Sequence, residues 1–236
     1  MRALALLSFI IIGSQLFAQN KQPKLNASIH ADVVSSFVWR GLLGSASPNF
    51  QPSINISKSG FSASLWGSTD VLGEFQELDV LFNYQIKNLN ISFSDYFWNP
   101  QKNYFDYNNA TTGHVFELGL QYSIPKIPIN IFAGTIIYGN DKKQTYYTNT
   151  NDSTNNNYST YVQLDYSFAV STIRFNTFTG FTPFTGLYGK DFSCIYIGIT
   201  GTKDIPITSK FTLPLFASFS ANPQTQKFFV VLGFSL

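Results

Sequence analysis

The chain has 236 residues, of which only 12% are charged and 17% are aromatic, and its formal net charge is +2. Ordinary soluble domains have about a quarter charged residues, so this composition is unusual for a soluble protein. Sparse charge without a basic cluster argues against nucleic acid as a partner. Few charges combined with many aromatic side chains is the composition that a sheet facing lipid requires.

Residues 1–18 have the layout of a secretory signal peptide. Arg2 precedes an apolar run over residues 3–12, and Ala18 provides a small residue before the polar residues that follow. The run is too short to span a bilayer as a helix, and no later segment approaches the roughly 18 to 20 apolar residues that a transmembrane helix needs. We therefore expect a single domain over residues 19–236, which would cross a membrane only as strands.

The residue types that bind metals and phosphates are scarce. The chain has two histidines and one cysteine, which cannot assemble a usual zinc set, and it has no glycine-rich phosphate loop between a strand and a helix. Cys194 cannot form an internal disulfide, and we expect it to be a small strand residue on an apolar face. The sequence predicts no cofactor and no metal.

Residues 25–41 carry the longest alternation of apolar and polar side chains in the sequence. One face holds Leu25, Ala27, Ile29, Ala31, Val33, Phe37 and Trp39, and the other is mostly polar. A strand of this length is too long for a typical soluble sheet but suits the wall of a barrel that crosses a bilayer and projects beyond it. We predict one continuous first strand here.

The remainder of the chain alternates in the same way. The further predicted strands cover residues 51–57, 61–68, 75–86, 89–98, 114–124, 129–138, 158–170, 173–182, 192–201, 210–221 and 227–236. Short links alternate with longer ones, the longest being residues 99–112 and 140–157, as in bacterial outer-membrane barrels with short periplasmic turns and long outer loops. We predict an all-β fold, a closed antiparallel up-and-down transmembrane β-barrel of about twelve strands with both termini on the periplasmic side.

The last strand, residues 227–236, has an apolar face and ends with the sequence. We expect it to pair with the first strand and so remove both sheet edges. It is similar to the terminal signal by which outer-membrane proteins are recognised for insertion. The expected partners are therefore outer-membrane lipids and the barrel-assembly machinery of a Gram-negative bacterium, whereas the sequence does not indicate an oligomeric state. Pro214 cannot donate a hydrogen bond within its strand, and we expect a bulge there.

Two short motifs resemble a known family. Residues 35–41, with the sequence SSFVWRG, resemble the serine, aromatic and Arg-Gly pattern in the first strand of the TorF-like porin family. Glu77-Leu78-Asp79 followed by Asn83-Tyr84 is similar to that family's second landmark, an E-x-D strand ending in Gly-Tyr, with Asn83 in place of the glycine. The resemblance covers residues 1–85 and the overall layout. It implies an outer-membrane barrel of poorly defined transport function and brings no catalytic residues.

If the polar faces point inward, the charged side chains separate into two walls of the lumen. The acidic wall is predicted to hold Glu77, Asp79, Glu117 and Asp165, and the basic wall Arg40, Arg174, Lys210 and Lys227. Opposed rows of charge would create a transverse field that orients small polar solutes. This pattern favours a porin-like channel for passive diffusion of small polar solutes.

Two alternatives remain open at this stage. The charges could instead be neutralising ion pairs inside a plugged barrel, because about eight strands fill their own interior and about sixteen open a channel. Such a barrel would be structural or would serve surface interactions. The second alternative is a lipid-modifying barrel enzyme. Ser28, His30 and Asp32 share a face, but same-face neighbours lie about 6.6 Å apart at their Cα atoms, too far for a nucleophile and its base. His114 has Phe116 where a serine would be needed. We expect no enzymatic activity and assign no catalytic residue.

Aromatic side chains gather near the predicted outer ends of the strands. They are Trp39, Tyr96, Phe97 and Trp98. We predict that they form an interfacial girdle at the membrane surface, with a sugar-stacking platform as the alternative.

Overall fold

The computed structural model describes residues 24–143 and 155–236, so the predicted signal peptide lies outside the described residues. The described strands are β1 (Asn26–Val34), β2 (Phe37–Trp39), β3 (Leu42–Ser45), β4 (Asn49–Lys58), β5 (Phe61–Asp70), β6 (Gln76–Ile86), β7 (Leu89–Tyr96), β8 (Val115–Ser123), β9 (Ile129–Gly139), β10 (Thr160–Val170), β11 (Ile173–Thr182), β12 (Ser193–Thr208), β13 (Phe211–Asn222) and β14 (Lys227–Ser235). No helix in this part of the chain is long and apolar enough to cross a bilayer.

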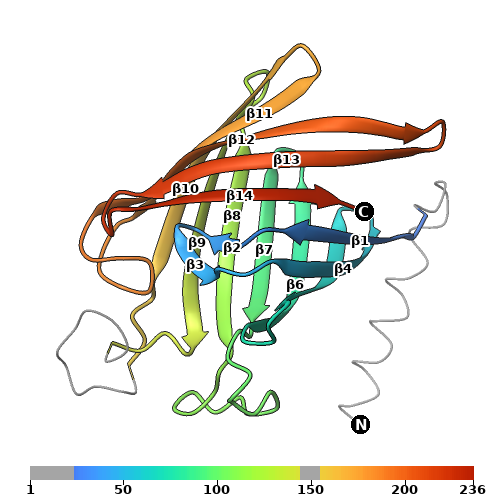
Figure 1. Ribbon diagram of the computed structural model, residues 1–236. Helices are drawn as coiled ribbons and strands as arrows, with labels where there is room; N and C mark the ends of the chain where they lie inside the picture. Colours follow the sequence, from blue (N-terminus) through green and yellow to red (C-terminus); the bar gives the residue numbers. More distant parts are fainter. Residues whose placement is uncertain (1–23, 144–154) are drawn as a thin grey trace, which may run out of the picture.

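All of these strands except β2 and β3 form one closed antiparallel barrel in which neighbours along the chain pair with each other. The ring closes where β1 pairs with β14, over Asp32–Val34 and Gly233–Ser235. Ala31 and Leu236 exchange two further backbone hydrogen bonds, and the C-terminus lies beside β1 (Figure 1). The predicted closed up-and-down barrel of twelve strands is confirmed.

The barrel has two rims, which we name by their connections. The turn rim carries the short links at residues 59–60, 87–88, 124–128, 171–172 and 209–210. The loop rim carries residues 71–75, 97–114, 140–143, 155–159, 183–192 and 223–226, together with the segment between β1 and β4. Both ends of the described chain lie toward the turn rim, because β1 begins there and β14 ends there.

The prediction of a single strand over residues 25–41 is wrong. β1 ends at Val34, and the chain leaves the wall to form the hairpin of β2 and β3 before returning as β4, which pairs with β1 along its whole length. Arg40 and Gly41 make the turn with φ values of 50° and 78°. The alternation continued past residue 34 because side chains that face an apolar interior have the same period as side chains that face lipid.

β12 is also longer than predicted, and the expected bulge at Pro214 is not present. β12 pairs with β13 from Ile197 to Thr208, so residues 202–208, predicted as a turn, extend the strand. Pro214 pairs in register with Asp204, and the irregularity lies at residues 206–208 instead. Polar side chains on both faces of this exposed hairpin obscured the strand in the sequence.

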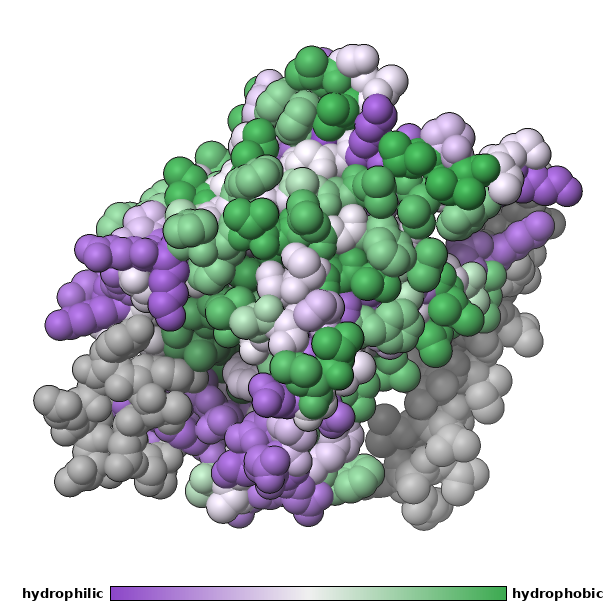
Figure 2. All heavy atoms as spheres, in the orientation of Figure 1, coloured by the Kyte–Doolittle hydropathy of each residue, from purple (hydrophilic) through white to green (hydrophobic). Residues whose placement is uncertain are grey.

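Side chains alternate strictly between the two faces of the wall. On β8, Leu118 and Leu120 are about half exposed, at 48% and 52%, whereas Val115 and Glu117, at positions of the opposite parity, are buried. The same parity places large apolar residues outside on the other strands, and Figure 2 shows apolar side chains over the middle of the wall with polar ones at its ends. The barrel therefore has an apolar exterior and a mainly polar interior.

Candidate functional site

The hairpin of β2 and β3 lies inside the barrel, where it contacts opposite parts of the wall. The Trp39 ring packs against Tyr96 of β7, Trp98 just after β7 and Tyr188 of the loop between β11 and β12, at centroid distances of 5.3, 5.9 and 5.6 Å. These residues border the buried hydrophobic cluster of the protein, which includes Tyr161 of β10. The hairpin therefore crosses the lumen and narrows it.

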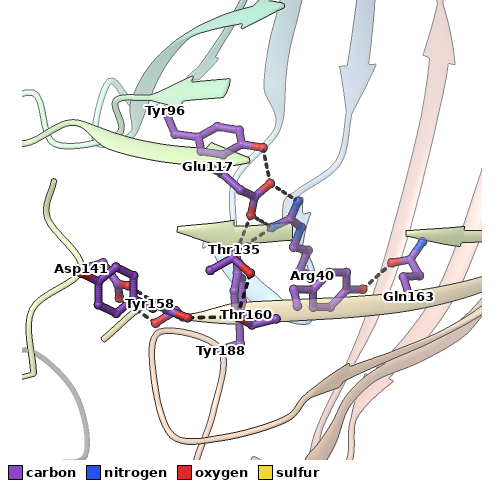
Figure 3. Close-up of polar contacts among 11 residues, drawn as sticks. Arg40, Tyr96, Glu117, Thr135, Asp141, Tyr158, Thr160, Gln163 and Tyr188 are labelled. Atoms are coloured by element: carbon purple, nitrogen blue, oxygen red, sulfur yellow. Dashed lines mark hydrogen bonds and ion pairs between the residues drawn. The ribbon is translucent and has the colours of Figure 1, made fainter. Parts of the chain in front are cut away.

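Arg40 at the tip of the hairpin forms a bidentate ion pair with Glu117 of β8. Its Nη2 donates to Oε1 at 2.8 Å and its Nη1 to Oε2 at 2.5 Å (Figure 3). Nη1 also donates to the Tyr188 hydroxyl at 2.5 Å, and the hydroxyls of Tyr96 and Tyr188 each donate to Glu117 at 3.2 Å. Glu117 is only 1% exposed, so every contact of this carboxylate is with the protein.

Aromatic rings surround the guanidinium group. Its Cζ lies 4.6 Å from the centroid of Trp39, 4.8 Å from Tyr161, 5.0 Å from Phe132 and 5.5 Å from Tyr188. Cation–π attraction strengthens in such a desolvated position. Burial raises the pKa of the Tyr188 hydroxyl well above its usual range, so it stays protonated and keeps its hydrogen bond to the carboxylate.

Glycines and a bulge make room for this assembly. A Cβ at Gly41 would lie 2.0 Å from the Ile195 carbonyl oxygen, and one at Gly134 would lie 2.7 Å from the Glu117 carboxyl carbon. The pairing of β11 with β12 shifts at Gly180 and Phe181, where Ile195 is the extra residue and is fully buried. Bulges re-aim side chains in this way. Asn222 completes the anchor by donating to the Gly41 carbonyl at 3.1 Å.

The charged residues predicted to line the lumen lie in four places. Arg40 and Glu117 are paired at the centre, and Glu77 and Asp79 lie on the inner face of β6. Asp165 accepts hydrogen bonds from Gln163 and Asn176 on the inner face of β10 and β11. The rest lie near the rims: Arg174 pairs with Asp204 at 2.6 Å near the turn rim, Lys210 lies in a turn, and Lys227 begins β14. Of the four predicted basic residues, only Arg40 is deep in the lumen.

Two cavities lie on either side of the hairpin along the wall formed by β5, β6 and β7. The outer cavity, about 250 Å³, lies toward the loop rim and includes Phe75, Trp98 and Leu187 in its lining. The inner cavity, about 310 Å³, includes Trp66, Asp79, Asn83, Ser92, Tyr96 and Glu117. Phe37, Trp39 and Glu77 line both cavities. These three side chains therefore lie where the two cavities meet along the hairpin.

The four aromatic residues predicted as an interfacial girdle lie in two different surroundings. Trp39, Tyr96 and Trp98 pack against the buried cluster beside the hairpin, and Trp39 and Trp98 line the outer cavity. Phe97 is buried and packs on Tyr104 at 5.1 Å and on His114 at 4.8 Å. Their position near the loop rim agrees with the sequence pattern, whereas their packing is with the protein interior.

His114 is completely buried under the loop of residues 97–113. Its Nδ1 lies 2.7 Å from Oδ1 of Asp95, and its Nε2 lies 2.5 Å from the Tyr104 carbonyl oxygen. The carbonyl can only accept, so Nε2 donates to it, while Nδ1 is engaged by the Asp95 carboxyl group. This pair fastens the loop to the barrel and leaves neither ring nitrogen free to act as a base. His30 lies 3.0 Å from Asp32 at an exposed position on β1.

Three of the aromatic partners of Arg40, namely Phe132, Tyr161 and Tyr188, were not predicted from the sequence. Tyr161 does carry a signal, because it has the inward parity of Gln163 and Asp165 on β10. Tyr188 lies in a loop, where no periodicity indicates its direction. Within the described ranges, no group of three or more histidine, cysteine, aspartate and glutamate side chains is placed to hold a metal ion.

No family model and no curated protein matches the chain. Among solved structures it is similar to a porin refined at 1.8 Å resolution, with 14% identical residues and a TM-score of 0.42. The match covers 80% of this chain and 61% of the porin, so the chain spans about three fifths of that protein's length. A likeness at this level of identity concerns the fold alone, so the function has to be inferred from this chain's own geometry.

Proposed function

We propose that the protein is an outer-membrane, porin-like channel for the passive diffusion of small polar solutes, narrowed by the internal hairpin. The observation that carries the proposal is the pair of cavities that adjoin at Phe37, Trp39 and Glu77. Together they offer a route past the hairpin inside a closed wall, with the Glu77 carboxyl group where the two cavities share their lining. A barrel built only for rigidity has no need of such a route.

The exterior supports placement in a membrane. Large apolar side chains such as Leu118, Phe82 and Val230 are exposed on the outward positions, and transferring them to lipid removes this surface from water. The closed seam of β1 and β14 leaves no long edge in the wall. We infer that outer-membrane lipids of a Gram-negative bacterium surround the wall, and that the assembly machinery recognises the C-terminal strand.

Membership of the TorF-like porin family is part of this proposal. The residues that resemble that family's first motif, 35–41, form the first half of the hairpin and its turn, including Arg40. The second motif places Glu77 and Asp79 on the facing wall. Both motifs therefore supply side chains that line the cavities beside the hairpin, where solutes would pass in the proposed channel.

A non-conducting barrel is the second candidate, because the Arg40, Glu117 and Tyr188 cluster occupies the centre of the lumen. A lipid-modifying enzyme receives less support. Both ring nitrogens of His114 are engaged, which leaves no base for a nucleophile. We therefore infer that the protein is not an enzyme.

Conductance in planar lipid bilayers separates the two candidates. Purified protein that is folded, as judged by circular dichroism and by heat-modifiable gel mobility, is expected to produce discrete current steps. In proteoliposome swelling, glycerol should enter and a trisaccharide should be excluded, because the hairpin leaves only a narrow route. Folded protein that never produces steps and never admits glycerol would refute the channel and favour the non-conducting barrel.

A further inference from the structure

The narrow part of the lumen has an excess of negative charge. Arg40, its only deep cation among the predicted lumen residues, is neutralised by the bidentate pair with Glu117. In the described parts of the chain, the ion pairs involve Asp32, Glu117, Asp95 and Asp204, and none involves Glu77 or Asp79. Asp79 is only 4% exposed and accepts one backbone hydrogen bond, from Phe97 at 3.3 Å. The two carboxyl groups of β6 therefore face the inner cavity without a basic partner of their own, and they contact each other, so a proton shared between them leaves the pair with a single negative charge.

Aromatic rings share the lining of the same cavity, and Trp66 lies beside Asp79 on the neighbouring strand. Phe37 and Trp39 project from the hairpin and Trp66 from β5, and the rings of Phe37 and Trp66 lie 5.5 Å apart. The face of an aromatic ring carries partial negative charge and attracts cations, most strongly for tryptophan. A solute in this cavity thus meets both carboxyl groups and aromatic rings.

The cavity has the size and polarity of a site for a small organic molecule. Its volume of about 310 Å³ lies at the lower end of the range for small-molecule sites, which begins at about 300 Å³. Amide and hydroxyl side chains of Asn83, Ser92 and Ser94 also line the cavity. Arg40 and Glu117 line it as well, and their ion pair leaves no net charge on these two residues. Low-dielectric walls strengthen the attraction between a carboxylate and a cation that has lost part of its hydration.

We propose that the inner cavity selects organic cations, namely small solutes that carry an ammonium, quaternary ammonium or guanidinium group. This inference rests on the proposed channel function and specifies the solute class that the channel favours. Glu77 and Asp79 attract the cation, and Trp39 and Trp66 hold its apolar or delocalised surface. The cluster around Arg40 holds the hairpin in the position that shapes the site.

Tryptophan fluorescence offers a test of binding that does not depend on conduction. The chain has three tryptophans. Trp39 and Trp66 line the inner cavity, and Trp39 and Trp98 line the outer cavity. Titration of the detergent-solubilised protein with choline is expected to change the fluorescence and to saturate. The neutral isostere 3,3-dimethylbutanol, with the same shape and no charge, should bind at least about tenfold more weakly.

Variants locate the site. Glu77→Gln, alone and together with Asp79→Asn, is expected to weaken choline binding by about tenfold or more, the single variant serving if the double variant fails to fold. Asp165→Asn is the matched control, because it removes a lumenal carboxylate outside this cavity, and it should leave choline binding unchanged. Equal binding of choline and its isostere, or binding unaffected by Glu77→Gln and by the double variant, would overturn the inference.

Measuring the reversal potential distinguishes cation selectivity from channel activity as such. In a gradient of choline chloride the wild-type channel should prefer choline over chloride, and Glu77→Gln should reduce that preference. Current steps without cation preference would refute the inference and leave the channel intact. Saturable choline binding without any current would support the cation site and refute the channel, and the lack of both binding and current would refute both.

Discussion

Replacing Arg40 with glutamine is expected to raise the single-channel conductance several-fold and to destabilise the protein by about 3–5 kcal/mol. The substitution removes both charge-assisted hydrogen bonds to Glu117 and leaves that carboxylate buried, at 1% exposed, without a cation. The hairpin loses its anchor at the same time. Conductance in planar bilayers and unfolding in urea, followed by heat-modifiable gel mobility, measure the two effects.

Two further variants distinguish the loss of the contact that holds the hairpin from the effect of leaving the Glu117 carboxylate buried without a cation. Arg40→Lys keeps the charge but loses the planar bidentate contact, so both effects should be smaller. The double variant Arg40→Gln with Glu117→Gln removes the uncompensated charge, so it should regain part of the lost stability and keep the raised conductance. Wild-type conductance in Arg40→Gln would show that the ion pair does not hold the constriction.

Excising the hairpin is expected to have the largest effect on permeation. Residues 36–47 can be replaced by a short Gly-Ser linker, because β1 and β4 already pair up to Val34 and Asn49 and a linker of two to five residues closes such a hairpin. The wall should remain closed while the lumen loses the side chains that cross it. We expect a several-fold rise in conductance and entry of the trisaccharide into proteoliposomes.

The control for this excision carries the same linker inserted at residues 209–210 of the turn rim, with the hairpin intact. It should fold and conduct as the wild type does. If the excised variant is folded and still excludes the trisaccharide, the lumen is blocked elsewhere and the hairpin is not the constriction.

The barrel wall could be predicted because the polarity of successive side chains along each wall strand indicates which of them face outward. Leu118 and Glu117 on β8 differ in polarity because one faces outward and the other inward, and this difference is repeated along the strand. Pairing between successive strands then follows from the short links, and closure follows from the need to remove the two edges. None of these steps requires knowledge of contacts that are distant in the sequence.

The site could be predicted only in part, because it depends on such distant contacts. Phe37 and Trp39 have the alternation of a wall strand, and nothing local distinguishes lipid from an aromatic interior as their surroundings. The partner of Arg40 lies 77 residues away, and Tyr188 lies 148 residues away. The charges of Glu117 and Arg40 were visible in the sequence, but their neutralisation depends on the hairpin turning inward.

The same inward turn changes the predicted electrostatics of the lumen. The sequence suggested a basic wall opposite an acidic one, with Arg174, Lys210 and Lys227 supporting Arg40. In the structure, Arg174 pairs with Asp204, which the sequence pattern had placed in a turn. The acidic side chains of β6 remain beside the hairpin, so we expect a preference for cations there rather than a balanced transverse field.

In the proposed membrane barrel, alternate residues of the wall face hydrocarbon. A single-cysteine scan along β6 in a Cys194→Ser background measures this directly, with an environment-sensitive fluorophore at positions 81 to 84 and brominated lipids as quenchers. Labels at 82 and 84, where Phe82 and Tyr84 are exposed, should be quenched, and labels at 81 and 83 should not. Quenching that is uniform, reversed or absent along these four positions would show that alternate residues of this wall do not face lipid.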